Sequence, residues 1–340
     1  MGWYAAVGRP LFFALPPEAA HRVAQALLGL PLPWRRIGGA RALPTLAVDL
    51  AGIPLRTPIG LAAGFDKTCA HLDALGALGF GYVVGGTITR HPRRGNPKPR
   101  IARDRAGRSM TNAMGLPNPG AEAAARHLAT GRRTAPRVVS LADEALEDAL
   151  AALGLVEPHA DGIELNASCP NVSWGRDRDN EAHLRELVEG FRERTSKPVF
   201  VKLPPFAGGT EREVVLALAT IAAEAGAQGL VVANTRPVED PRLATGSGGL
   251  SGRALWDATA PAVAEMRSAT GLPVVACGGV ASGDDVLACM EAGAAAVQVY
   301  TAFVYEGPGL PGALARGLAA RLRERDVALS DLIGTSRPAA

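Results

Sequence analysis

The chain has 340 residues, of which 47% are hydrophobic and 20% charged, and its formal net charge is +3. So high an apolar fraction supplies a sizeable core, which excludes a largely disordered chain. The positive charge is small and mostly scattered, so we do not predict nucleic-acid binding.

The four cysteines form no C-x-x-C pair and the six histidines are dispersed. We therefore predict neither a disulfide framework nor a metal site. No apolar run approaches the ~20 residues that cross a bilayer, and the amino terminus lacks the pattern of a signal peptide. We expect the chain to stay inside the cell.

Residues 1–40 differ in character from the rest of the chain. Aromatic and aliphatic residues recur at roughly helical spacing from Trp3 to Leu15, Pro16-Pro17 interrupts them, and a second helix is expected from about Glu18. The pattern predicts a small helical hairpin with an aromatic apolar face. Such a face either packs against the main domain, or serves as a membrane-surface anchor or the mouth of a site for an apolar partner.

From about residue 46, short apolar runs end in glycine or a polar residue and are followed by segments rich in alanine and leucine. An open doubly wound sheet would carry a G-x-G-x-x-G turn after its first strand, and none stands there. We therefore predict an α/β fold, a closed (β/α)8 TIM barrel at 41–325 with a tail at 326–340. The expected strands are Ile59–Ala63, Tyr82–Gly86, Arg137–Leu141, Gly162–Leu165, Val199–Leu203, Gly229–Ala233, Val274–Ala276 and Ala296–Tyr300.

The stretch Gly162–Asn171 begins as one of these strands and ends in two amides and a thiol. In barrels of this kind chemistry takes place at the carboxyl ends of the strands, so the polar and glycine residues after each run are the candidate site. They are Asp66, Lys67, Thr87, Ser140, Asn166, Cys169, Asn171, Lys202, Asn234, Thr235, Gly278, Gly279, Tyr300 and Thr301.

Two lysines and two turns suggest an anionic ligand. Lys202 lies within an apolar run, where its ammonium group needs an anion. Lys67 is either paired with the adjacent Asp66 or available to a ligand. The backbone at Gly278-Gly279 and at Tyr300-Thr301 suits a phosphate, although the glycine pair is equally typical of a tight turn.

Taken together, the motifs of residues 50–305 resemble the dihydroorotate dehydrogenase family. The hairpin, with Pro17 to His21, resembles the amino-terminal segment of the family's class 2 branch, which is membrane-associated and uses quinones. The matching motifs are Gly60 to Lys67, Gly85 to Thr89, Gly95 to Arg100, Asn112 to Leu116, Asn166 to Asn171, Gly248 to Arg253 and Val297 to Tyr300.

The resemblance implies oxidation of dihydroorotate to orotate in pyrimidine synthesis, with FMN as cofactor and a membrane quinone as acceptor. It implies that Cys169 is the general base, and a cationic Lys202 suits stabilisation of the reduced flavin. Residues 1–40 would then attach the protein peripherally to the cytoplasmic face of the membrane. FMN would be held by Ala63, Gly64, Lys67, Thr87, Ser140, Asn166, Lys202, Ala233, Gly252, Gly279, Tyr300 and Thr301. Dihydroorotate would be held by Lys67, Asn112, Ala113, Met114, Gly115, Leu116, Asn166, Asn171, Asn234 and Thr235.

The chain departs from the family pattern at several positions. Class 2 members carry serine at the base position, so Cys169 resembles class 1. Ser140, Ala233 and Ala113 stand where the family has asparagine, threonine and arginine, and each lost hydrogen bond is worth about 0.5–1.5 kcal/mol. The quinone-binding arginine of class 2 is also displaced, and Arg90 or His91 is expected to replace it or to form a solvated loop at lipid headgroups.

Two other functions remain open on the sequence. One is an FMN-dependent oxidoreductase that acts on another cyclic amide or passes electrons to another acceptor, such as fumarate. The other is a membrane-attached flavin-binding protein without activity. The hairpin argues against a soluble acceptor, and the retained Lys67 and asparagines argue against a pure flavin binder.

Overall fold

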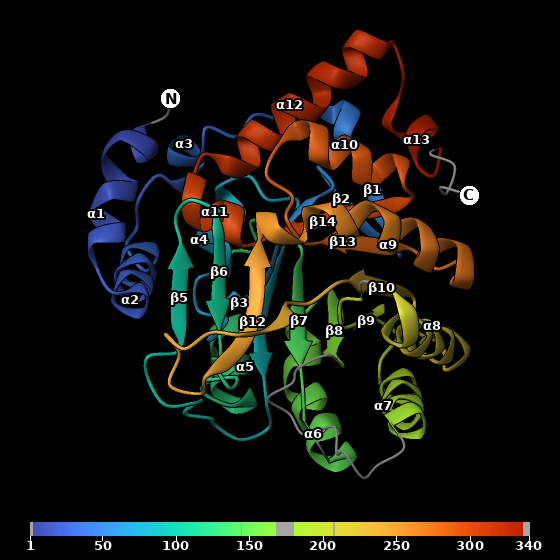
Figure 1. Cartoon of the computed structure of the whole chain (residues 1–340). Helices are drawn as coiled ribbons and strands as arrows, with labels where there is room; N and C mark the ends of the chain where they lie inside the picture. Colours follow the sequence, from blue (N-terminus) through green and yellow to red (C-terminus); the bar gives the residue numbers. More distant parts are fainter. Residues whose placement is uncertain (1–2, 144, 168–179, 207, 336–340) are drawn as a thin grey trace.

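The centre of the computed structural model, which describes residues 3–143, 145–167, 180–206 and 208–335, is a closed barrel of parallel strands (Figure 1). All eight predicted strands are present, so the predicted TIM barrel is confirmed. In their order around the barrel they are β10 (Gly229–Val232), β13 (Val274–Cys277), β14 (Ala294–Val299), β3 (Ile59–Asp66), β4 (Tyr82–Ile88), β7 (Arg137–Leu141), β8 (Gly162–Asn166) and β9 (Val199–Lys202).

The strands are buried on both faces, which is why their sequences are nearly continuous in apolar residues. Along each strand, one set of side chains packs against the helices and the alternate set fills the barrel. The interior set includes Tyr82, Val138 and Phe200. Gly60 makes room for it, because a Cβ there would lie 2.3 Å from the Tyr82 ring.

Helices surround the barrel, and a short antiparallel pair, β1 (Val48–Leu50) and β2 (Ile53–Leu55), packs on its interior cluster. The surrounding helices are α4 (Leu72–Ala77), α5 (Ala121–Ala129), α6 (Leu146–Val156), α7 (Asn180–Arg194), α8 (Gly209–Glu224), α9 (Trp256–Thr270), α10 (Gly283–Glu291), α11 (Thr301–Glu306), α12 (Leu310–Arg325) and α13 (Leu329–Leu332).

A second, antiparallel sheet was not predicted. Its order is β11 (Arg236–Glu239), β12 (Ser247–Gly252), β6 (Ser109–Asn112) and β5 (Ile101–Asp104). It joins two insertions that are far apart in the chain, one after β4 and one after β10. These strands are short, and β11 and β12 are polar or rich in glycine, so they lack the apolar alternation that identifies a strand locally.

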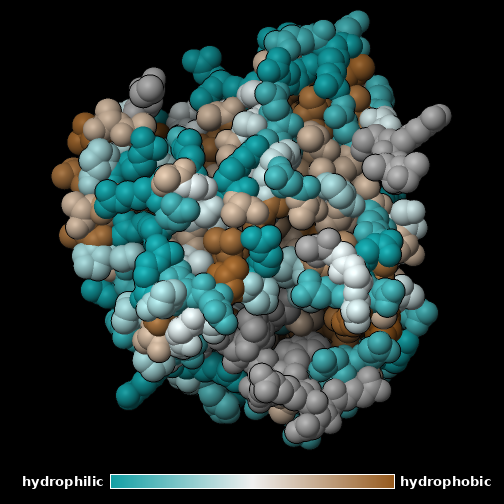
Figure 2. Space-filling model, viewed as in Figure 1, coloured by the Kyte–Doolittle hydropathy of each residue, from teal (hydrophilic) through white to brown (hydrophobic). Residues whose placement is uncertain are grey.

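The amino-terminal segment contains η1 (Tyr4–Gly8), α1 (Arg9–Ala14), α2 (Pro17–Leu28) and α3 (Trp34–Gly38), and α1 and α2 form the expected hairpin beside the barrel (Figure 1). Phe13 packs on Tyr305 with the ring centroids 5.1 Å apart. Hydrophobic residues gather over α1 and α2 at the left edge of Figure 2. Within the described ranges, no helix has the length and apolar character needed to span a membrane. The exposed apolar residues of this segment are Trp3, Val7, Leu11, Leu15, Val23, Leu27, Leu30 and Leu32.

Candidate active site

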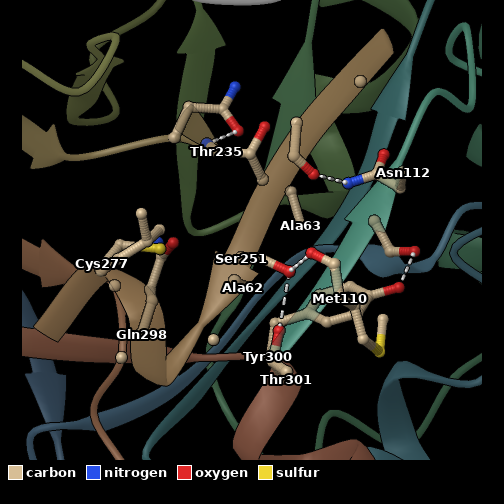
Figure 3. Close-up of a pocket in the computed structure, with 18 of the residues that line it drawn as sticks. Ala62, Ala63, Met110, Asn112, Thr235, Ser251, Cys277, Gln298, Tyr300 and Thr301 are labelled. Atoms are coloured by element: carbon tan, nitrogen blue, oxygen red, sulfur yellow. Dashed lines mark hydrogen bonds between the residues drawn. The ribbon is translucent and has the colours of Figure 1, made fainter. Parts of the chain in front are cut away.

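A cavity of about 980 Å³ lies at the carboxyl ends of the barrel strands and extends to the antiparallel sheet (Figure 3). It is lined by every predicted site residue that the structure describes, except Asp66 and Ser140. Cys169 and Asn171 lie outside the described residues. The predicted residues at the cavity are Ala63, Gly64, Lys67, Thr87, Asn112, Ala113, Met114, Gly115, Leu116, Asn166, Lys202, Ala233, Asn234, Thr235, Gly252, Gly279, Tyr300 and Thr301.

Ser140 reaches the cavity only through a neighbour. Its side chain is fully buried, and its Oγ lies 3.0 Å from Thr87 Oγ1. Asn166 Nδ2 donates to the same Thr87 oxygen at 3.1 Å. These three side chains, from β7, β4 and β8, therefore form one hydrogen-bonded row that orients the Asn166 amide.

Lys202 has a counterion within the chain. In the parallel ladder of β8 and β9, Lys202 pairs with Asn166, and Glu164 lies two residues before Asn166 on the same face of its strand. Lys202 Nζ is 3.9 Å from Glu164 Oε1, and the two side chains are only 6% and 0% exposed. Burial opposes the charge of Lys202, but the neighbouring Cys277 and Glu164 raise its pKa above the ordinary value.

The sequence predicts an anion beside Lys202, and the structure shows that Glu164 supplies it. Glu164 itself was not among the predicted site residues. The available signal was a carboxylate inside an otherwise apolar strand. Gln298 Nε2 donates to the second oxygen of Glu164 at 3.1 Å from across the barrel. Glu164 Oε1 and Gln298 Oε1 are buried acceptors with no hydrogen-bond partner among the described residues.

A second group of polar residues lies where β3, β10 and the antiparallel sheet meet. Asn234 Oδ1 accepts from the Thr235 backbone N–H at 2.8 Å, and Asn112 Nδ2 donates to Gly249 O at 3.3 Å. Their amides supply both donors and acceptors at the cavity wall.

Lys67 is not held by Asp66 in an ion pair. Its Nζ donates to Gly64 O, while the Asp66 carboxylate accepts from Thr68 Oγ1 at 2.8 Å and from the His71 N–H at 2.6 Å. Burial lowers the pKa of Lys67 to about 8, with the Asp66 charge opposing the shift. Lys67 is therefore a cation below that pH, and it loses its charge as the pH rises through about 8.

The opposite end of the cavity is formed by the turns after β13 and β14. Gly279 has a φ of +69°, and a Cβ there would lie 2.7 Å from Trp256 Cα, so this turn requires glycine. Arg253 Nη1 donates to Gly279 O at 3.2 Å and to Asp285 at 2.7 Å. Arg253 thus adds a cation beside the predicted phosphate turn.

The residues after β14 are hydrogen-bonded to the antiparallel sheet. Thr301 Oγ1 donates to Ser251 Oγ at 2.9 Å, and Ser251 Oγ donates to Met110 O at 3.2 Å, as the dashed lines in Figure 3 show. Tyr300 OH donates to Gly64 O at 3.2 Å. Hydrogen bonds therefore link the antiparallel sheet to the ends of β3 and β14 along this side of the cavity.

Arg90 and His91 contact helices of the barrel, and their expected role at the quinone or at lipid headgroups stays a prediction. Arg90 Nη1 pairs with Glu122 of α5 at 3.0 Å, and His91 lies 3.8 Å from Asp148 of α6. The hairpin is instead contacted by arginines from the β5 region. Arg103 donates to the carbonyl oxygens of Phe12 and Leu15, and Arg105 to that of Phe13.

Comparisons with known proteins point to one family. The family model described as dihydroorotate dehydrogenase matches residues 45–322. The dihydroorotate dehydrogenase (quinone) of Erythrobacter litoralis is 39% identical over 344 residues, covering 96% of this chain and 98% of the relative. The dihydroorotate dehydrogenase (quinone) of Thermus thermophilus is 40% identical over 337 residues, covering 92% of this chain and 95% of the relative. Among solved structures, the DHODH of Eimeria tenella in complex with ferulenol is 29% identical, with a TM-score of 0.82 and coverage of 94% of this chain and 95% of that one.

Proposed function

The chain belongs to the dihydroorotate dehydrogenase family, and we propose on that basis that it oxidises dihydroorotate to orotate in pyrimidine synthesis and passes the electrons to a quinone. The observation that carries the proposal is the single cavity that brings together Lys67, Lys202 and the three asparagines Asn112, Asn166 and Asn234. The relatives named for the quinone reaction match this chain over its hairpin as well as its barrel, since they cover up to 97% of it.

FMN is the cofactor that fits the cavity. The buried acceptor Gln298 Oε1 suits a ligand that offers an N–H donor, and the cation of Lys202 lies beside it at the strand ends. Arg253 and the Gly279 turn suit a phosphate at the far end. A flavin held there would supply hydride acceptance from the substrate and release of electrons, singly or in pairs, to the quinone.

The remaining polar groups are assigned to the substrate. Lys67 holds the carboxylate of dihydroorotate, while Asn112, Asn166 and Asn234 bind the amide edges of its ring. Cys169 is proposed as the base that removes the ring proton as the hydride departs, because it corresponds to the general base in the motif that resembles the family. Lys202, kept protonated beside Glu164, would stabilise negative charge on a flavin held at the strand ends.

Anaerobic mixing of the purified protein with dihydroorotate tests this function. We expect the visible flavin absorbance to bleach rapidly and to return when a quinone is added, whereas orotate leaves it unchanged. A yellow protein that dihydroorotate does not bleach would contradict the substrate. A colourless protein that cannot be loaded with FMN would contradict the cofactor.

We propose peripheral attachment at the cytoplasmic face of the membrane, in which the quinone is dissolved, and the exposed apolar face of the hairpin supports the attachment itself. Val7 and Leu11 are 58% and 66% exposed, which is costly in water and favourable at a lipid interface. Arg103 and Arg105 fix the end of α1 against the barrel, so this face is held at one edge of the molecule.

Replacing Val7 and Leu11 together by aspartate is expected to lower binding to lipid vesicles by at least about tenfold, because two charges would enter the apolar interface. Turnover with a soluble dye is expected to stay unchanged. The matched control is Val214→Asp on α8, where the side chain is similarly exposed at 52%. Equal vesicle binding by wild type and the double variant in a co-sedimentation assay would refute attachment through this face.

A further inference from the structure

One face of helix α2 lies against the end of β3 and against Arg100, next to the residues proposed to bind the substrate. Glu18, His21 and Gln25 follow one another at helical spacing on that face. Gln25 Nε2 donates to Phe65 O at 2.7 Å, and the His21 and Phe65 rings meet edge to face with centroids 5.5 Å apart. Phe65 is separated from Lys67 by a single residue, so this face supports the end of β3 that carries the lysine.

Arg100 forms the second connection between α2 and the cavity. Its Nε donates to Glu18 Oε1 at 2.7 Å, and the two side chains are only 10% and 19% exposed. Its Nη1 lies within hydrogen-bonding distance of three backbone carbonyls, those of Arg94 at 2.9 Å, Asn96 at 3.2 Å and Met114 at 3.4 Å. One guanidinium therefore ties the hairpin carboxylate to the loop at the substrate pocket.

The loop of residues 112–116, here called the substrate loop, has a backbone that needs support from its neighbours. Gly115 and Leu116 have φ values of +69° and +53°, a left-handed backbone that is unfavourable for leucine and needs support. Asn96 supplies part of the support, since its N–H donates to Met114 O at 2.9 Å and its Nδ2 to Ala113 O at 3.1 Å. The N–H of Ala113 donates to Arg100 O at 2.9 Å.

We propose that Glu18 is a positioning residue for dihydroorotate binding, because it holds the Arg100 guanidinium against the substrate loop. The hairpin would then serve both halves of the reaction, the quinone through its apolar face and dihydroorotate through Glu18. Without the carboxylate, Arg100 is a largely buried cation that has lost its closest counterion and turns toward solvent. It then releases Met114 O of the substrate loop and the carbonyls of Arg94 and Asn96 beside it. The proposal rests on the proposed function, since it takes the substrate loop as the place of the pyrimidine.

Glu18→Gln tests the proposal in the full-length holoenzyme, with a soluble dye as acceptor so that quinone binding does not contribute. We expect the KM for dihydroorotate to rise about fivefold while kcat stays within about twofold, because the loop affects binding more than chemistry. We also expect faster hydrogen exchange at the Ala113 and Asn96 amides. The matched control is Arg105→Gln, which removes a hairpin contact that does not touch the substrate loop. It is expected to leave both measurements unchanged.

Arg100→Lys provides a second variant should Glu18→Gln not fold. The lysine keeps a cation near Glu18 but cannot also reach Met114 O and the neighbouring carbonyls in the same way, so the same rise in KM is expected. Unchanged hydrogen exchange in the substrate loop of either variant would overturn the proposal, as would an equal rise in KM for Arg105→Gln. A wild-type protein that does not oxidise dihydroorotate would refute the proposed function, and hydrogen exchange would still decide whether Glu18 positions the loop.

Discussion

Replacing Lys202 by methionine is expected to abolish turnover and to lower the free energy of unfolding by about 3–5 kcal/mol. Methionine fills a similar volume, so the loss is electrostatic rather than a matter of packing. Glu164 is fully buried and already has one oxygen without a hydrogen-bond partner in the described structure. Without Lys202 its charge is uncompensated in the barrel interior, and the folded state must bear that cost.

The double variant Lys202→Met, Glu164→Gln separates stability from activity. Glutamine keeps the shape of Glu164 and removes its charge, so most of the lost stability is expected to return in urea unfolding. Turnover is expected to remain absent, because no cation is left beside the cofactor site. Should Lys202→Met alone unfold like the wild type, Lys202 and Glu164 would not form a charged pair. Should the double variant regain turnover, Lys202 would have no part in the chemistry.

Cys169→Ala is expected to reduce turnover by about 10²–10⁴-fold while the protein stays yellow, because a general base contributes about that factor. A thiol base with an ordinary pKa of about 8.5 predicts a rate that rises with pH as the thiolate forms. In Cys169→Ser we expect that rise to move to higher pH, since a hydroxyl is far less acidic than a thiol. Turnover and its pH profile, measured at saturating dihydroorotate, test both expectations.

Cys289→Ala is the matched control for these cysteine variants. Cys289 is fully buried in α10, and burial raises the pKa of its thiol to about 12, so it stays protonated and unreactive. The control is expected to keep full turnover and an unchanged pH profile. Undiminished turnover in Cys169→Ala would remove Cys169 from the mechanism.

The barrel and most of the candidate site could be predicted from the sequence. Strands that are buried on both faces must be apolar over their whole length, so β7, for example, was found with its exact bounds, Arg137–Leu141. Parallel strands of a closed barrel end at one rim, so the residues after them meet whatever the details of packing. Lys67 and Asn234 could therefore be assigned to one cavity before any distance was known, whereas Asn112 was assigned through the family resemblance.

The polar partners of these residues were decided by the tertiary structure. Glu164 and Lys202 meet because neighbouring strands have a particular register, and Glu18 meets Arg100 across 82 positions of the chain. The four strands of the antiparallel sheet and the arginines that hold the hairpin are likewise brought together only by folding. A long-range polar contact has no local periodicity, because each partner is an ordinary charged residue until the backbone brings the other within reach. Burial makes the sequence of every barrel strand apolar, whereas the pairing of charged residues is visible only in the tertiary structure.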